Sequence, residues 1–86
     1  MPRRVALVGA GLVGAGWAIV FARAGSEVLL HDAQPGQAER ALERIAASLA
    51  DLEAQALLRE PRAALAARIR VAASLEEALA GADYVQ

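Results

Sequence analysis

Cysteine, lysine, asparagine and threonine are all missing from this 86-residue chain. Without cysteine there is no disulfide framework, no metal–thiolate site and no thiol nucleophile, and we expect no metal site of any kind. All nine basic residues are arginine, and the formal net charge is −1 without a basic block. This charge pattern argues against nucleic acid and acidic membranes as partners.

Long uninterrupted apolar runs are also missing. No segment is apolar for long enough to span a bilayer. The basic start, residues 1–4, leads into an apolar stretch that glycines interrupt, so we do not interpret it as a signal peptide. The default expectation is a cytoplasmic protein. A chain of 86 residues is one domain at most, with a modest core of its own.

Two apolar runs near the amino terminus are typical of buried strands. We expect strands at Arg4–Val8 and Glu27–His31, with a helix between them from Leu12 to Ala24 that Gly25 ends. Asp32 follows the second strand directly. This order, with an acidic residue about 20 positions beyond a glycine-rich loop, is the fingerprint of a dinucleotide-binding βαβ unit.

The glycine-rich loop has the spacing G-x-G-x-x-G at Gly9, Gly11 and Gly14. The first glycine permits a sharp turn, the second lets a pyrophosphate approach the backbone, and the third lets the helix pack closely on the sheet. The phosphates would meet free backbone N–H groups in the first helical turn, at Leu12 and Val13. The loop lacks the Gly-Lys-Ser/Thr of a Walker-type phosphate loop. A glycine-rich turn without a ligand is the alternative.

Asp32 indicates which dinucleotide binds. A carboxylate at the end of the second strand accepts hydrogen bonds from the adenosine ribose hydroxyls and repels a 2′-phosphate. No arginine occurs at positions 33–37, and we expect Arg40 to lie well inside a helix, so NAD(H) is favoured over NADP(H). FAD enzymes usually carry glutamate at this place. The alternative role for Asp32 is to cap a helix ahead of Pro35.

The rest of the chain predicts three helices and two strands. Ser74 and Glu77 fit a capping box, so we interpret Ser74 as a helix cap rather than a nucleophile. The expected elements are a long amphipathic helix from Pro35 to about Leu58, a short helix over 61–67, a strand over 68–72, a helix from Ser74 to Gly81 and a strand over 83–86.

This order of elements predicts an α/β fold. Right-handed crossovers place the strands in the order 3-2-1-4, which is the amino-terminal part only of a Rossmann-type doubly wound parallel sheet. Residues 1–86 would be an incomplete NAD-binding domain that lacks the second half of the sheet and a catalytic domain. We expect Trp17 and Phe21 to lie in the core, and His31 to pack near the adenine pocket rather than act as a base.

Several stretches resemble the NAD-binding part of the 3-hydroxyacyl-CoA dehydrogenase family. These are residues 5–18, the strand end at His31 and Asp32, the long helix with its helical hairpin, and residues 74–79 and 81–86. Trp17 and the closing Tyr84-Val85-Gln86 look most like the branch with L-gulonate 3-dehydrogenase, lambda-crystallin and carnitine dehydrogenase. One departure is Val13, where many family members have methionine.

The resemblance implies hydride transfer between NAD and a 3-hydroxy acid or 3-hydroxyacyl-CoA. It also implies a catalytic histidine beyond the fourth strand, so this chain holds no catalytic residue and we expect it to be inactive alone. Acyl-CoA members are expected to meet CoA phosphates with basic hairpin residues. Here only arginines are available, which favours a small hydroxy acid: Arg59, Arg62, Arg68 and Arg70. We expect the whole enzyme to be a homo-oligomer. The alternative function is a non-catalytic NAD-sensing or crystallin-like structural module.

Overall fold

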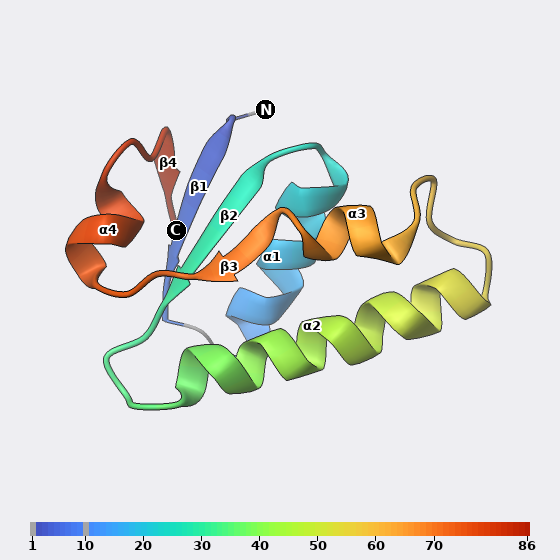
Figure 1. The fold of residues 1–86 in the computed structure, drawn as a ribbon, viewed down its shortest axis with the longest axis horizontal. Coiled ribbons are helices and arrows are strands. Elements are labelled where there is room, and N and C mark those ends of the chain that lie inside the picture. Colours follow the sequence, from blue (N-terminus) through green and yellow to red (C-terminus); the bar gives the residue numbers. More distant parts are fainter. Residues whose placement is uncertain (1, 10) are drawn as a thin grey trace.

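Four parallel strands form one sheet in the order β3-β2-β1-β4 (Figure 1). The computed structural model describes residues 2–9 and 11–86. The strands are β1 (Arg4–Val8), β2 (Glu27–His31), β3 (Ile69–Val71) and β4 (Tyr84–Val85). The predicted strand order and the α/β class are therefore confirmed, and β1 and β2 have the predicted bounds.

Strands β3 and β4 are shorter than predicted, but the residues that flank them in the sequence still form backbone hydrogen bonds to the adjacent strands. Arg68 O accepts from Val28 N at 2.7 Å, and Ala72 N donates to Leu30 O at 2.8 Å. Beside β4, Asp83 N donates to Arg4 O at 2.8 Å. The predicted strands 68–72 and 83–86 therefore include the flanking residues that bond to the sheet, whereas the regular strands are one residue shorter at each end.

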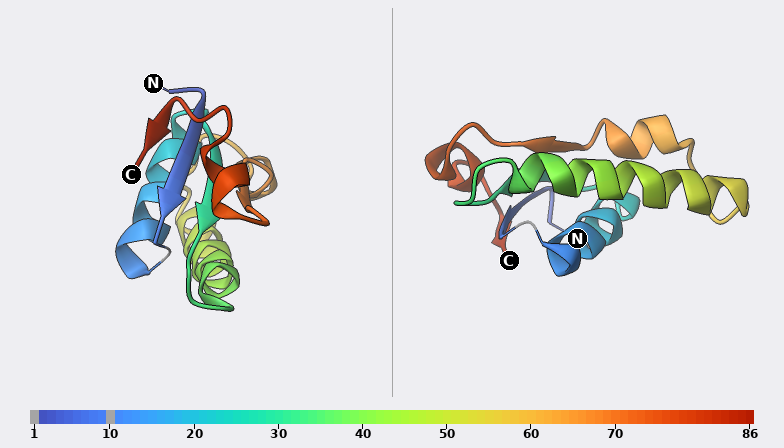
Figure 2. Two further views of the ribbon diagram at one scale, coloured as in Figure 1. Left: turned by 90° about the vertical axis from the view of Figure 1, so that its left-hand side faces the viewer. Right: turned by 90° about the horizontal axis from the view of Figure 1, so that it is seen from below.

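Helices cover the two faces of the sheet unequally. Helices α1 (Leu12–Arg23), α2 (Gln37–Ala54) and α3 (Arg62–Ala66) lie on one face, and the short α4 (Leu75–Leu79) lies on the other (Figure 2). Because side chains alternate along a strand, Val5 and Leu7 of β1 join the larger core and Ala6 joins the smaller one. Two layers of helices around a parallel sheet thus position the strand ends.

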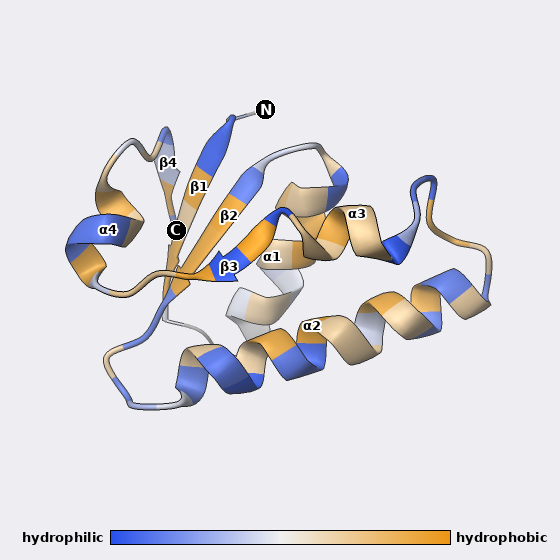
Figure 3. Ribbon diagram, in the orientation of Figure 1, coloured by the Kyte–Doolittle hydropathy of each residue, from blue (hydrophilic) through white to orange (hydrophobic). Residues whose placement is uncertain are grey.

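The larger core combines apolar side chains of the sheet with one stripe of α2. Figure 3 shows the strands largely hydrophobic and α2 with mixed character along its length. Ala18 and Ala22 of α1 and Ala41 of α2 are fully buried. Such small side chains let helices pack closely against the sheet and one another. The buried α2 stripe recurs at helical spacing, as predicted: Ala38, Ala41, Ile45 and Leu49.

Helix α2 is shorter at both ends than the prediction of Pro35 to about Leu58. It begins at Gln37, because Gly36 precedes it as the N-cap with a left-handed φ of 79°. It ends at Ala54, because Ala56 turns left-handed at φ 57°. The amide of Ala56 donates to Glu53 O at 3.0 Å, and the amide of Leu57 donates to Leu52 O at 2.9 Å. These two bonds form a Schellman motif, which ends a helix.

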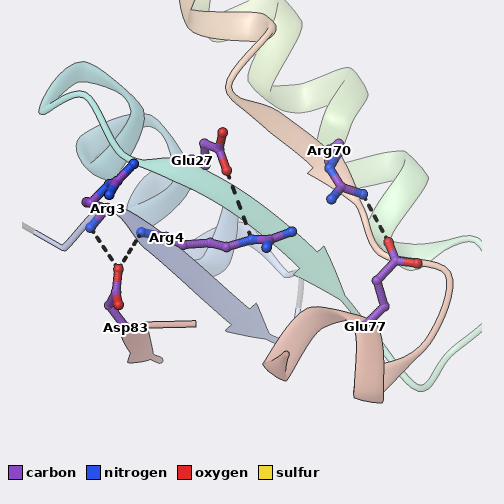
Figure 4. A network of polar contacts seen from close by, with 6 residues as sticks. All are labelled: Arg3, Arg4, Glu27, Arg70, Glu77 and Asp83. Atoms are coloured by element: carbon purple, nitrogen blue, oxygen red, sulfur yellow. Dashed lines mark hydrogen bonds and ion pairs between the residues drawn. The ribbon is translucent and has the colours of Figure 1, made fainter. Parts of the chain in front are cut away.

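Helix α4 begins at the predicted cap, but the capping box forms only in part. The amide of Glu77 donates to Ser74 Oγ at 3.1 Å. The Glu77 carboxylate does not complete the box; it accepts from Arg70 Nη1 on β3 at 3.0 Å (Figure 4). The acidic side chain therefore ties α4 to the edge strand of the sheet.

The amino terminus is fixed to the far end of the chain. Asp83 accepts backbone hydrogen bonds from Arg3 at 3.2 Å and Arg4 at 3.1 Å (Figure 4). Buried Ser26 also donates its hydroxyl to Pro2 O. Among the described residues, we find no helix that combines the length and the apolar character needed to cross a membrane.

Candidate functional site

The glycine loop lies where β1 ends, and His31 at the end of β2 lies directly opposite Val8 in the parallel register. Gly9 continues the β1–β2 pairing, because its N–H donates to His31 O at 2.8 Å. Gly9 then adopts φ 94°, a left-handed conformation that suits glycine and turns the chain out of the strand. The loop therefore opens at the carboxyl edge of the sheet, where ligands bind in doubly wound folds.

Gly11 leaves the start of α1 open. It is the N-cap of this 12-residue helix and supplies no side-chain hydrogen bond to the first turn. A Cβ built on Gly11 would meet no atom within 4 Å. The first turn of a helix has N–H groups without backbone partners and a positive dipole end. An anion could therefore approach here, and Leu12 and Val13 are the first residues of that turn.

Gly14 is confined by the loop itself. A Cβ built on it would lie 2.6 Å from the carbonyl oxygen of Gly9. Real side chains do not tolerate so short a contact, and the atom in the way belongs to backbone that cannot swing aside. A glycine here therefore lets α1 pass closely over the end of β1.

An open groove of about 470 Å³ borders this loop. Its lining includes Trp17, which is 40% exposed, so the prediction that Trp17 lies in the core is wrong. Phe21 is 7% exposed and does belong to the core. Trp17 shares this groove with Gln86, the residue that follows β4 at the edge of the described sheet. The groove is lined by Leu7, Val8, Gly9, Gly11, Gly14, Trp17 and Gln86.

Asp32 lies in a separate, smaller pocket of about 170 Å³. Its Oδ1 accepts from the amide of Gln34 at 2.8 Å, a local turn that fixes the carboxylate beside the strand end. The alternative role as a cap of α2 does not hold, because Gly36 is the N-cap. His31 and Glu39 also border this pocket. The predicted position of His31 at the strand end is thus the observed one.

Arg40 is nearer to the start of its helix than predicted. Because α2 begins at Gln37, Arg40 lies in its first turn rather than well inside the helix. Its Nε and Nη2 donate to Gln37 Oε1 at 3.2 and 3.0 Å. Arg40 does not line the pocket beside Asp32.

Two of the four hairpin arginines are tied to the hairpin itself. Arg62 Nε lies 3.4 Å from Glu53 Oε1. Arg68 binds both oxygens of Glu60, at 2.6 and 2.8 Å. The hydrogen bonds from Arg68 lower the pKa of the Glu60 carboxyl below its ordinary value, and Glu60 raises the pKa of Arg68. These charges are therefore satisfied within the chain.

The other two hairpin arginines are Arg70 and Arg59. Arg70 pairs with Glu77, as described above, and Arg59 is exposed. Within residues 2–9 and 11–86, no three His, Asp or Glu side chains gather in a way that could hold a metal ion. The strongest candidate site is therefore the glycine loop with the neighbouring Asp32 pocket.

Comparison with known proteins identifies the family. Residues 4–86 match the family "3-hydroxyacyl-CoA dehydrogenase, NAD binding domain". The chain therefore belongs to the NAD-binding domain of the 3-hydroxyacyl-CoA dehydrogenase family, as the resemblance implied. NAD is the cofactor of this domain.

Individual relatives agree with this assignment. The chain is 42% identical to an L-carnitine dehydrogenase of Streptomyces griseus over 98% of its own length and 24% of the relative. It is 38% identical to a lambda-crystallin homolog of Bos taurus over 99% and 27%. The 3-hydroxybutyryl-CoA dehydrogenase of Escherichia coli has a TM-score of 0.87 at 34% identity, covering 99% of this chain and 18% of that one. The chain thus spans about a quarter of the length of the curated relatives it matches.

Proposed function

We propose that residues 1–86 are the amino-terminal part of the NAD-binding domain of an NAD-dependent dehydrogenase. The whole enzyme would transfer a hydride between NAD and a 3-hydroxy acid or 3-hydroxyacyl-CoA. One observation carries the proposal: the open glycine loop at the end of β1 lies beside the Asp32 pocket at the end of β2. Adjacent phosphate and ribose sites are what a dinucleotide requires.

Each residue of the loop has a proposed task. Gly9 turns the chain, and Gly11 leaves room for the pyrophosphate, since a Cβ there meets no protein atom within 4 Å. The first-turn N–H groups, beginning with Leu12 and Val13, would bind the phosphate oxygens. Gly14 holds the helix close enough for this contact. Asp32 would accept hydrogen bonds from the ribose hydroxyls, and bound NAD would supply the hydride acceptor.

The acid–base chemistry is proposed to lie outside residues 1–86. His31 is the sole histidine and borders the Asp32 pocket, on the adenosine side of the proposed site. Proton transfer needs a group within hydrogen-bond reach of the substrate hydroxyl. We therefore expect residues 1–86 alone to lack dehydrogenase activity.

A small hydroxy acid is the favoured substrate over an acyl-CoA. Three of the hairpin arginines each form an ion pair with a carboxylate: Arg62, Arg68 and Arg70. Binding a CoA phosphate would require these ion pairs to break. Relatives at 36–42% identity are named L-carnitine dehydrogenases. We infer that the whole enzyme is a homo-oligomer. A cytoplasmic location stays a prediction from the composition.

The alternative, a crystallin-like or NAD-sensing module, is supported by the lambda-crystallin relatives at 36–38% identity. Both functions require the same dinucleotide site. The two functions differ in whether the protein turns over a substrate. Reading the coding sequence beyond residue 86 would distinguish them, because a downstream His–Glu pair favours the enzyme.

The proposal is tested by titrating NADH against the parent chain, Gly11→Val and Gly16→Val. Gly16→Val is the matched control, because Gly16 is an exposed glycine of α1 that borders neither pocket. We expect Gly11→Val to weaken NADH binding at least tenfold, or about 1.4 kcal/mol, and Gly16→Val to bind like the parent. Asp32→Ala should also weaken binding. Equal affinities of the parent and Gly11→Val would refute the phosphate cradle.

A further inference from the structure

The pocket beside Asp32 presents two carboxylates and no guanidinium. Its acidic lining residues are Asp32 at the end of β2 and Glu39 in the first turn of α2. Glu39 is exposed to solvent. The pocket therefore has a negative rim on two sides.

The first turn of α2 would otherwise favour an anion. The amino-terminal end of an 18-residue helix carries a partial positive charge. Gly36, the N-cap, provides no side-chain hydrogen bond to that turn. Glu39 is the acidic residue in the turn, and its charge offsets the attraction of the helix end for a phosphate.

Arg40, the nearest guanidinium in the sequence, is bound to Gln37 and does not line the pocket. Both Nε and Nη2 donate to Gln37 Oε1, at 3.2 and 3.0 Å. Nη1 lies beside Gly36, only 3.1 Å from where a Cβ on that residue would be. The guanidinium thus lies beside Gly36 at the border of the pocket, bound to Gln37, and is not among the groups that line the pocket.

We propose that Glu39 is a second specificity-determining residue for the unphosphorylated dinucleotide, with Gln37 restraining Arg40. The inference rests on the proposed function and goes beyond the role of Asp32. A ribose 2′-phosphate would bring up to two negative charges between the two carboxylates. Like charges repel, and the repulsion weakens as salt is added. Glu39 therefore lowers NADPH affinity while leaving NADH affinity nearly unchanged.

The experiment compares dissociation constants for NADPH and NADH at low ionic strength in the parent, Glu39→Gln and Glu43→Gln. Glu43 is one turn further along α2, exposed and away from the pocket, so Glu43→Gln is the matched control. The measured quantity is the dissociation constant for NADPH divided by that for NADH. We expect Glu39→Gln to lower this ratio about 3- to 10-fold, as a screened like-charge interaction implies. Glu43→Gln should leave the ratio unchanged. Near 1 M salt the difference should disappear.

A second arm tests the restraint on Arg40. Gln37→Ala should release the Arg40 guanidinium and lower the ratio of dissociation constants, because NADPH then binds more tightly. Adding Arg40→Ala to the Gln37→Ala variant should raise the ratio again. Thermal unfolding checks that each variant is folded, and Glu39→Ala should reproduce Glu39→Gln. A Glu39→Gln ratio equal to that of Glu43→Gln overturns the inference.

The failure of this inference is distinguishable from failure of the proposed function. If Asp32→Asn shifts the ratio and Glu39→Gln does not, the dinucleotide site stands and the role of Glu39 falls. We expect residues 1–86 to bind NAD weakly, because the nicotinamide side of the site would lie beyond the fourth strand, so the titration extends to millimolar concentration. If the parent binds neither NADH nor NADPH there, both the proposed function and this inference are overturned. Binding of both dinucleotides with equal affinity also overturns the inference, because no discrimination then exists.

Discussion

At the scale of single residues, two helices end with the same motif built on different residues. After α1, the amide of Gly25 donates to Ala22 O and the amide of Ser26 donates to Phe21 O, both at 3.0 Å. After α2, the amides of Ala56 and Leu57 make the equivalent pair of bonds. Gly25 has φ 98° and Ala56 has φ 57°. Only the alanine has a Cβ that this conformation strains.

We therefore predict that Ala56→Gly stabilises the protein. Relief of left-handed strain contributes about 1–2 kcal/mol, and the greater freedom of glycine in the unfolded chain costs about 0.5–1 kcal/mol. The free energy of unfolding should thus rise by about 0.5–1 kcal/mol. Urea denaturation measures it. Gly25→Ala, the reverse change at the matching position, should destabilise; an Ala56→Gly variant less stable than the parent would contradict the strain argument.

Residue-level patterns explain both what the sequence predicts and what it misses. The dinucleotide fingerprint, Gly9 to Gly14 with Asp32, indicates the strand–helix–strand order because each glycine meets a distinct backbone need. The end of α2 was predicted too late, because apolar Ala56, Leu57 and Leu58 continue the helical pattern and no glycine marks the turn. Trp17 was misplaced because periodicity identifies the apolar face of a helix but not whether a further layer covers it.

At the scale of secondary-structure elements, Arg68 connects three parts of the fold. It precedes β3 directly, its Nη1 donates to Ala22 O near the end of α1 at 2.9 Å, and its guanidinium pairs with Glu60 before α3. Arg23 Nη2 adds a bond to Leu57 O at 3.1 Å. The α2–α3 hairpin is thereby attached to the end of α1. Sequence spacing could not predict this pairing, because the loop geometry brings the charges together.

Loss of the Glu60 charge should loosen this attachment in acid. Arg68 lowers the pKa of Glu60 below 4.5, so the folded state favours the carboxylate. The resulting stability is present above pH 4.5 and is lost as the pH falls through the lowered pKa. Glu60→Gln should be less stable than the parent at pH 7, and the difference should shrink toward pH 3.

Denaturation curves at the two pH values measure this change, with Glu43→Gln as the exposed control. The control should follow the parent at both values. A Glu60→Gln deficit that stays constant between pH 7 and pH 3 would count against the ion pair as its cause.

At the scale of the whole molecule, one end of the sheet is left uncovered. In the described chain β4 is an edge strand, and Tyr84 and Val85 are 43% and 50% exposed. Trp17 and Val20 of α1 are 40% and 51% exposed on the neighbouring helix. An exposed edge with apolar side chains invites pairing with another chain.

Residues 1–86 alone should therefore self-associate. Val85→Lys should weaken association about tenfold, since burying a valine contributes on the order of 1.5 kcal/mol. Leu57→Lys is the matched control, because Leu57 is equally exposed at 52% but lies in the α2–α3 loop. Light scattering over a concentration series measures the mass. A parent chain that stays monomeric at all concentrations would be incompatible with this expectation.

The attachment of Asp83 to the amides of Arg3 and Arg4 has a consequence for the order of folding. These partners are 80 and 79 residues apart, so the contact closes nearly the whole chain into one loop. Closing so long a loop costs entropy before any contact repays it. During synthesis β1 can therefore pair with β2 first, and its other flank stays unpaired until residues 83–86 have left the ribosome.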